Sequence, residues 1–235
     1  MRSLRLLGMV CLTVGVCGFT CTAAALAEEL PELLPNPTKT QPLGFKGEGG
    51  NLTLETAKGT KFQCTGYTDE GTITSVRSGT AHIDFKGCRT GKTGCSTSGD
   101  AAETVLDEGA INLVTFLRSN ILTLGIEANL SESANLAINC GVLLVLLKGA
   151  IIAEVTNGKE LEKIKSGEGV LRQAKGSQEI KECDHPVEVC FEENKFKEKI
   201  HKKFLLQIEL GKGFEEAGLE MTGKVTLAKE VELHF

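Results

Sequence analysis

Apolar and polar residues alternate in short runs along most of the chain from Gly44 onward. In one such run, Ala81, Ile83 and Phe85 alternate with polar residues, and glycine-rich segments separate the runs. A period of two places successive side chains on opposite faces of a strand, and turn signals between such runs are typical of antiparallel sheets. The pattern therefore predicts an all-β, mainly antiparallel protein, a sandwich or a partly open barrel, with at most short helical turns.

Two pairs of apolar segments give more specific predictions. Residues 111–117 and 121–128 flank a polar turn signal and are expected to form a hairpin. Residues 140–147 and 150–155 are the most apolar part of the chain and flank Lys148-Gly149. Because they are apolar on both faces, we expect them to form two core strands.

The C-terminal part of the chain is less regular. Residues 225–235 alternate and predict a closing strand, and residues 204–210 also favour a strand. Residues 191–203 fit a strand or a helix, because their apolar positions match both periods. Residues 213–218 could hold one helical turn.

The N-terminus has the pattern of a secretory signal peptide. Arg2 and Arg5 precede an uncharged, mainly apolar stretch, and Ala25-Leu26-Ala27 is a small-residue cleavage site. Cleavage after Ala27 is expected, which would leave no stable membrane span. The alternative is a retained anchor, because residues 6–27 are long enough to cross a bilayer.

Three parts are expected along the chain. After the signal peptide, residues 1–27, comes a proline-rich tail, residues 28–43, and then a single β-rich domain, residues 44–235. The tail either docks on the domain through its leucines or forms a disordered spacer. A rise in charged residues leaves open a subdivision of the domain near residues 150–160.

The cysteines predict a disulfide framework. Six of the nine cysteines lie beyond the signal peptide, and an even number in an exported chain predicts three disulfides among 15 connectivities. The expected pairs are Cys88–Cys95 and Cys183–Cys190, which span short turn-like segments, with Cys64–Cys140 as the third.

The amino-acid composition argues against several classes of protein. With 41% hydrophobic and 24% charged residues, the chain is neither a disordered polymer nor a polytopic membrane protein. A net charge of −5 predicts no nucleic-acid partner. Tryptophan is absent and Tyr67 is the single tyrosine, which disfavours the aromatic platforms of sugar-binding proteins.

Two constellations are candidates for chemistry. His82 and Asp84 lie two residues apart and are expected on the same strand face, where a carboxylate can orient an imidazole for base catalysis. An exposed polar face is the simpler interpretation. Cys183, His185 and Cys190 could ligate zinc with Asp184, but the two thiols are expected to oxidise after export. No cofactor is expected.

Three sequence stretches carry a resemblance to known proteins. They are residues 50–64 (GNLTLETAKGTKFQC), residues 80–88, which end in Asp-Phe-Lys-Gly-Cys, and residues 213–219, followed by a strand that closes in Glu-Val-Glu-Leu. Together they resemble a group of secreted, β-rich bacterial proteins of actinobacterial type with no assigned function. The resemblance implies an exported protein with disulfides, and it implies no substrate and no site residues.

These observations favour a non-catalytic structural or binding module, located extracellularly or in the cell envelope. Its partner would be a cell-envelope polymer or another extracellular protein. The lysine-rich residues 195–203 are interpreted as a solvated face, with contact to an anionic polymer or lipid as the alternative. One alternative function is a secreted hydrolase around His82 and Asp84. Another is a protease inhibitor that presents the loop between Cys88 and Cys95 or between Cys183 and Cys190.

Overall fold

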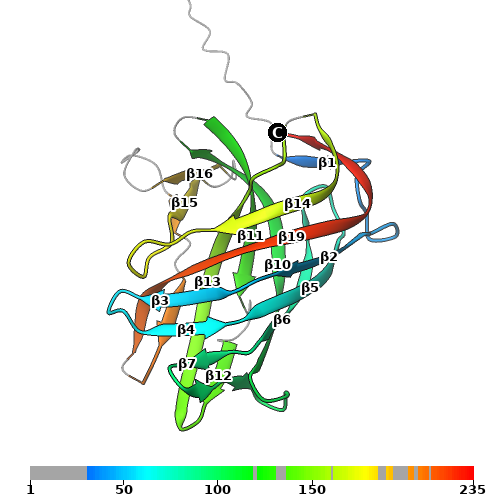
Figure 1. Ribbon diagram of the computed structural model, residues 1–235. Helices are drawn as coiled ribbons and strands as arrows, with labels where there is room; N and C mark the ends of the chain where they lie inside the picture. The colour runs from blue at the N-terminus through cyan, green and yellow to red at the C-terminus, as the bar shows by residue number, and fades with distance from the viewer. Residues whose placement is uncertain are drawn as a thin grey trace, which may run out of the picture.

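Antiparallel strands close into a ring in the computed structural model (Figure 1). The structure describes residues 31–118, 121–130, 136–159, 161–184, 189–192, 201–203, 206–211 and 213–235. Every regular element in these ranges is a β-strand, which confirms the all-β, mainly antiparallel class. The signal peptide lies outside the described residues.

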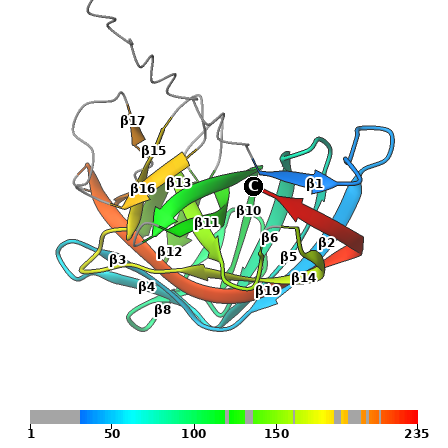
Figure 2. The same ribbon diagram turned by 90° about the horizontal axis from the view of Figure 1, so that it is seen from above.

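Eight strands pair successively and return to the first. In ring order they are β2 (Leu43–Gly49), β5 (Gly66–Ile73), β6 (Ser78–Lys86), β10 (Thr104–Arg118), β11 (Ile121–Leu130), β13 (Leu143–Val155), β14 (Lys163–Leu171) and β19 (Phe214–His234). Figure 2 shows these strands around a common interior. The antiparallel pairing of β10 with β11, from Ile111↔Ala128 to Arg118↔Ile121, confirms the expected hairpin.

A second group of short strands extends the ring at the end that is lower in Figure 1. Its members are β3 (Leu52–Thr56), β4 (Lys61–Cys64), β7 (Arg89–Thr90), β8 (Thr93–Gly94), β9 (Ser96–Thr97), β12 (Leu136–Cys140) and β18 (Gln207–Glu209). Strands β13 and β19 run through both parts and exchange partners on the way. Because of these exchanges the ring is not a regular barrel.

The continuity of β13 and β19 corrects two expectations. Residues 140–155 were expected to form two strands separated at Lys148-Gly149, but β13 runs unbroken through both residues. Gly149 has a φ of 108°, a conformation that favours glycine, at the point where β13 changes partner from β12 to β11. Residues 213–218 contain no helical turn, because Phe214 begins β19.

The proline-rich segment docks on the upper end of the ring. Strand β1 (Glu32–Leu34) pairs with the last residues of β19. On its other side the Leu33 amide donates a hydrogen bond to the Val76 carbonyl at 3.1 Å, and Arg77 lies 3.6 Å from Glu32. Leu33 is buried, so the described part of this segment is not a spacer.

A small outer layer covers one side of the ring. It consists of β15 (Ile180–Asp184), β16 (Val189–Glu192) and β17 (His201–Lys203). Strand β16 runs parallel to β10 through Thr115–Leu117. A separate buried apolar cluster joins Ile180 of this layer to side chains of the ring, namely Val114, Phe116, Ala150 and Ile152.

The interior of the ring follows the alternation seen in the sequence. On β6 the residues Ala81, Ile83 and Phe85 point inward, whereas His82 points to solvent. The inward side chains form one buried cluster in the lower half and one in the upper half, and Ile83 packs against both. The period of two therefore predicted the inner faces correctly.

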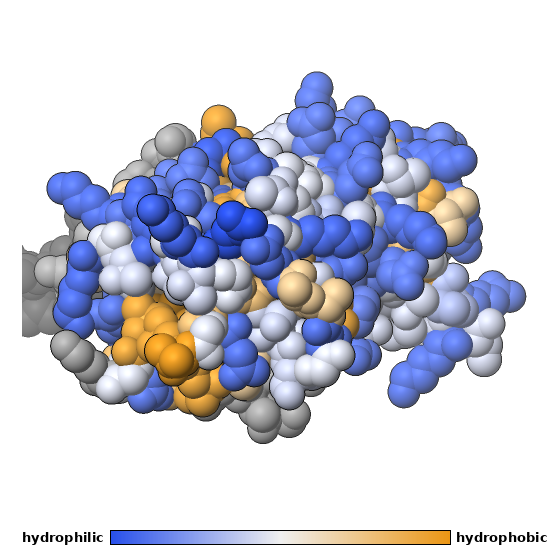
Figure 3. All heavy atoms as spheres, turned by 60° about the horizontal axis from the view of Figure 1, so that its bottom comes forward, coloured by the Kyte–Doolittle hydropathy of each residue, from blue (hydrophilic) through white to orange (hydrophobic). Residues whose placement is uncertain are grey.

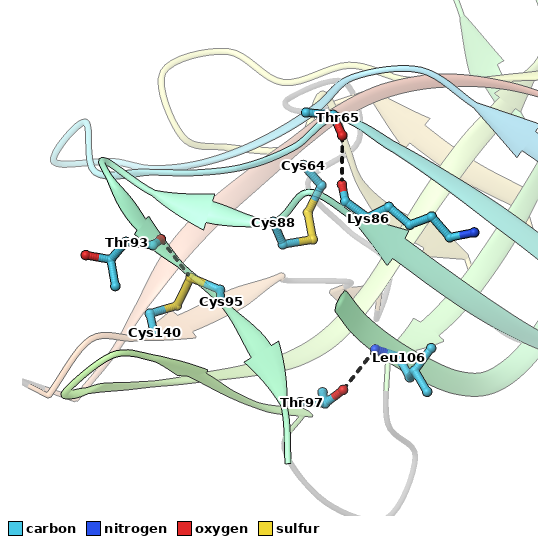
Figure 4. Close-up of a disulfide and its surroundings, with 9 residues drawn as sticks. All are labelled: Cys64, Thr65, Lys86, Cys88, Thr93, Cys95, Thr97, Leu106 and Cys140. Carbon is cyan, nitrogen blue, oxygen red and sulfur yellow. Dashed lines mark hydrogen bonds between the residues drawn. A yellow bond between two sulfur atoms is a disulfide. The ribbon is translucent and has the colours of Figure 1, made fainter. Parts of the chain in front are cut away.

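Two disulfides close the lower extension, and they differ from the expected pairs (Figure 4). Cys64 is bonded to Cys88, and Cys95 to Cys140. The predictions Cys88–Cys95 and Cys64–Cys140 are therefore wrong. The Cys95 amide donates to the Cys88 carbonyl at 2.8 Å, so the two residues are neighbours, but each side chain bonds to a different strand.

The strand neighbours explain this pairing. The Thr65 amide donates to the Lys86 carbonyl at 2.8 Å, which brings the end of β4 beside the segment that holds Cys88. Strand β9, which follows Cys95, pairs with β12, whose last residue is Cys140. The third expected pair stays a prediction, and the β15–β16 register places Cys183 directly opposite Cys190.

Candidate ligand-binding cavity

The interior of the ring holds a cavity of about 170 Å³ between the lower and upper buried clusters. Side chains from most of the ring strands line it, and most of them are apolar. Representative lining residues are Phe45, Ile83, Ile126, Ala153, Val155 and Val225. At its upper end the cavity reaches Leu33 of β1.

Glycines on β14 leave this space open. Gly167 and Gly169 belong to the inner face of the ring, since they lie opposite Val225 and Gly223 of β19. A Cβ built on Gly169 would have Ala153 as its nearest neighbour at 3.9 Å, and one on Gly167 would have Val155 at 3.8 Å. These are ordinary contact distances, so a larger side chain at either position would enter the cavity.

Glycines on the neighbouring strands serve a different purpose. Tyr67 and Asp69 of β5 lie opposite Gly49 and Gly47 of β2. A Cβ at Gly47 would overlap the Asp69 carboxylate, and one at Gly223 would overlap the Tyr67 hydroxyl. The side chains of Asp69 and Tyr67 therefore pack directly on the backbone of these glycines, which a residue with a Cβ would prevent.

Two acidic residues line the cavity, and Asp69 is the less exposed of them, since Glu168 of β14 is exposed. The Oδ1 atom of Asp69 is buried and has no hydrogen-bond partner among the described residues. Burial raises the pKa of the Asp69 carboxyl from 3.8 to about 6, against a smaller lowering by a backbone hydrogen bond. Burial also raises the pKa of the Tyr67 hydroxyl, with a further contribution from the charge of Asp69.

A second buried carboxyl group, that of Asp107, lies in register with Asp69 across strands β5, β6 and β10. Ile83 lies opposite Asp69 on one side and opposite Asp107 of β10 on the other. Asp107 is 5% exposed, and burial raises the pKa of its carboxyl from 3.8 to about 6. Backbone hydrogen bonding and the nearby His82 oppose this shift, but burial dominates. Asp107 does not line the cavity.

These shifts predict an unusual pH dependence of stability. Between pH 4 and 6 the folded Asp107 holds a proton that the unfolded chain has lost, so its contribution to stability falls as pH rises. The free energy of unfolding of Asp107→Asn, relative to that of the original protein, should therefore increase as pH rises. The increase should reach up to about 3 kcal/mol between pH 4 and pH 7. Chemical denaturation of both proteins across this range measures the difference.

Glu70→Gln is the control for that series. Glu70 is an exposed residue on β5 whose carboxylate forms an ion pair with Lys46 at 3.1 Å. Water solvates its charge in the folded and unfolded states, so the variant should show no comparable change with pH. An Asp107→Asn curve parallel to that of the original protein would contradict the prediction.

The residues selected from sequence lie outside the cavity. His82 and Asp84 share the outer face of β6, as expected from their spacing. His82 is flanked by Glu70 and Glu108 on the adjacent strands, and Asp84 forms an ion pair with Lys86 at 3.4 Å. Both flanking residues are carboxylates, so the strands next to His82 place no hydroxyl or thiol directly opposite it.

The structure does not describe all of the residues proposed as zinc ligands. His185 is not among the described residues, and the same is true of most of the lysine-rich residues 195–203. Within the described ranges, no three potential ligands from histidine, cysteine, aspartate and glutamate gather at one point. The same ranges contain no helix long and apolar enough to cross a membrane.

Sequence reasoning missed Asp69. The signal for it was present, because Tyr67, Asp69, Gly71 and Ile73 share one parity on β5, and Tyr67 and Ile73 are buried. An acid at an inward position of an amphipathic strand is costly unless something pairs with it. That signal becomes visible only once the inner face of β5 is known.

The outer surface is mainly polar, with one gathering of apolar side chains in the view that brings the lower end forward (Figure 3). Among the described residues, Val142 and Leu144 at the β12–β13 turn are exposed large hydrophobic side chains. Nothing in the structure shows what would cover them, so the interior cavity is the stronger candidate site.

Comparison with known proteins adds no template for this site. No protein-family model, no curated protein and no solved structure matches the chain. The candidate site therefore depends on the geometry of this chain alone.

Proposed function

We propose that this protein is a non-catalytic binding module that holds one small, mainly apolar molecule inside its ring. A single observation carries the proposal: the cavity of about 170 Å³ is lined mainly by apolar side chains, and one of its few polar groups, Asp69, has a buried Oδ1 with no partner among the described residues. Apolar walls with few polar groups are typical of small-molecule sites.

The size of the cavity limits the ligand. An apolar cavity of about 150 Å³ in another protein accommodates benzene, whereas drug-sized ligands occupy about 300–1,000 Å³. The expected ligand is therefore one ring or a short branched chain, of roughly ten non-hydrogen atoms or fewer.

We further propose that the protein acts outside the cell or in the cell envelope. The two disulfides indicate an oxidising environment. The signal-peptide pattern of residues 1–27 supports export in particular. A module that is exported with a preformed apolar cavity is suited to capturing a small molecule from its surroundings.

Filling the cavity tests the proposal. Toluene should bind the original protein saturably, as measured by isothermal titration calorimetry, and should raise its thermal midpoint. Gly169→Leu should abolish both effects, because the new side chain would occupy the cavity. At a concentration 100 times its Kd, toluene should stabilise the original protein by about 2.7 kcal/mol.

Val170→Leu is the matched control for this variant. Val170 lies next to Gly169 on β14, and its side chain points to the outer face of the ring. The same change in residue size there should leave toluene binding intact. If toluene and similarly small hydrocarbons fail to bind the original protein, the proposed function is wrong.

A further inference from the structure

The position of Asp69 restricts which donors can reach its carboxylate. On β2 it lies opposite Gly47, and on β6 it lies opposite Ile83. Neither residue has a side chain that donates hydrogen bonds. Asp69 lines the inner cavity and also an open pocket on the outer surface, and its Oδ1 is buried. The inner cavity leaves room for a partner of this carboxylate.

The nearby basic side chains are engaged elsewhere. Lys46, on β2, points outward and forms an exposed ion pair with Glu70 at 3.1 Å. Arg77, in the turn after β5, lies at the upper end of the cavity, 3.6 Å from Glu32 of β1. Among the described residues, no basic side chain forms an ion pair with the Asp69 carboxylate.

Aromatic rings near Asp69 favour a cation rather than a neutral donor. Tyr67 lies two residues away on the same face of β5, and its ring centroid is 6.0 Å from that of Phe85. Phe45 also lines the cavity. The faces of aromatic rings attract ammonium groups, and this attraction grows when water is excluded.

We infer that the ligand is a small apolar amine, whose ammonium group pairs with Asp69 while its hydrocarbon part fills the cavity. This inference rests on the proposed function and adds the chemical class of the ligand. A charge-assisted hydrogen bond would give Oδ1 of Asp69 the partner that the described residues do not supply, and it would pair the ammonium group as that group leaves water.

Benzylamine and toluene separate this inference from the proposed function. The two probes share an aromatic ring, and benzylamine adds an amine. At pH 7.5 we expect benzylamine to bind the original protein about 10- to 100-fold more tightly than toluene, as charge-assisted hydrogen bonds typically contribute. Isothermal titration calorimetry measures both affinities.

Asp69→Asn is expected to remove the preference for benzylamine over toluene, measured as the ratio of the two affinities in the same variant. Glu70→Gln, which removes an outward carboxylate from the adjacent position, should keep it. If the original protein binds toluene at least as tightly as benzylamine, the inference is overturned and the proposed function stands. If neither probe binds, both fail. The comparison of probes on the original protein needs no variant, so a folding defect in Asp69→Asn cannot obscure the result.

Discussion

Replacing Cys95 and Cys140 together by serine is expected to lower the free energy of unfolding by about 4 kcal/mol. The bond closes a loop with a sequence separation of 45, and both residues are almost fully buried. Its loss gives the unfolded chain more conformational freedom and removes the covalent link between β12 and Cys95, while the backbone pairing of β12 with β9 remains. Denaturant unfolding without reductant measures the change.

The Cys64–Cys88 bond provides the comparison within the same extension. Its separation is 24, so the double serine variant should lose slightly less, about 3.5 kcal/mol. Peptide mapping by mass spectrometry under non-reducing conditions checks the pairing itself and shows whether Cys183 is bonded to Cys190. A cross-linked peptide that joins Cys88 to Cys95 would contradict the structure.

Phe116→Ala is expected to lower the free energy of unfolding by about 3–5 kcal/mol. Phe116 is fully buried, although it lies on the outer face of the ring. It is buried in one cluster with Val114 and Ile152 of the ring and with Ile180, the first residue of β15. Removing the phenyl group of Phe116 would leave a void that the layer of β15 and β16 could fill only by moving. Chemical denaturation measures the effect.

Phe214→Ala is the matched control, since Phe214 is only partly buried and its ring lies 3.7 Å from the Lys148 amine. We expect it to cost about 1 kcal/mol, the usual range for a partly exposed cation–π contact. Equal losses for the two variants would mean that the outer layer does not bury Phe116.

Local patterns predicted the strands well wherever one face of a strand meets the interior. The alternation of Ala81, Ile83 and Phe85 identified β6 and its inner face, and the β10–β11 hairpin followed from two apolar segments around a turn. Such patterns succeed because a strand displays its side chains with a period of two, whatever its neighbours are.

The same reasoning failed where a strand is shared between two parts of the fold. A glycine next to a lysine resembles a turn, yet β13 passes through Lys148 and Gly149 because it has partners on both sides of them. The residues at the start of β19 are extended for the same reason, since β18 and β3 pair with them. Long-range pairing overrides a local turn signal.

Residue order by itself determined the secondary-structure class, the parity of the inward positions and the presence of cysteines suited to disulfides. These depend on backbone geometry and composition, which act locally. Only the tertiary structure decided which cysteines meet, because disulfide partners are set by which strands become neighbours. It also decided that Asp69 lies over Gly47 at the wall of a cavity opened by Gly167 and Gly169. A cavity is the space that several strands leave unfilled together, so no single segment of the chain encodes it.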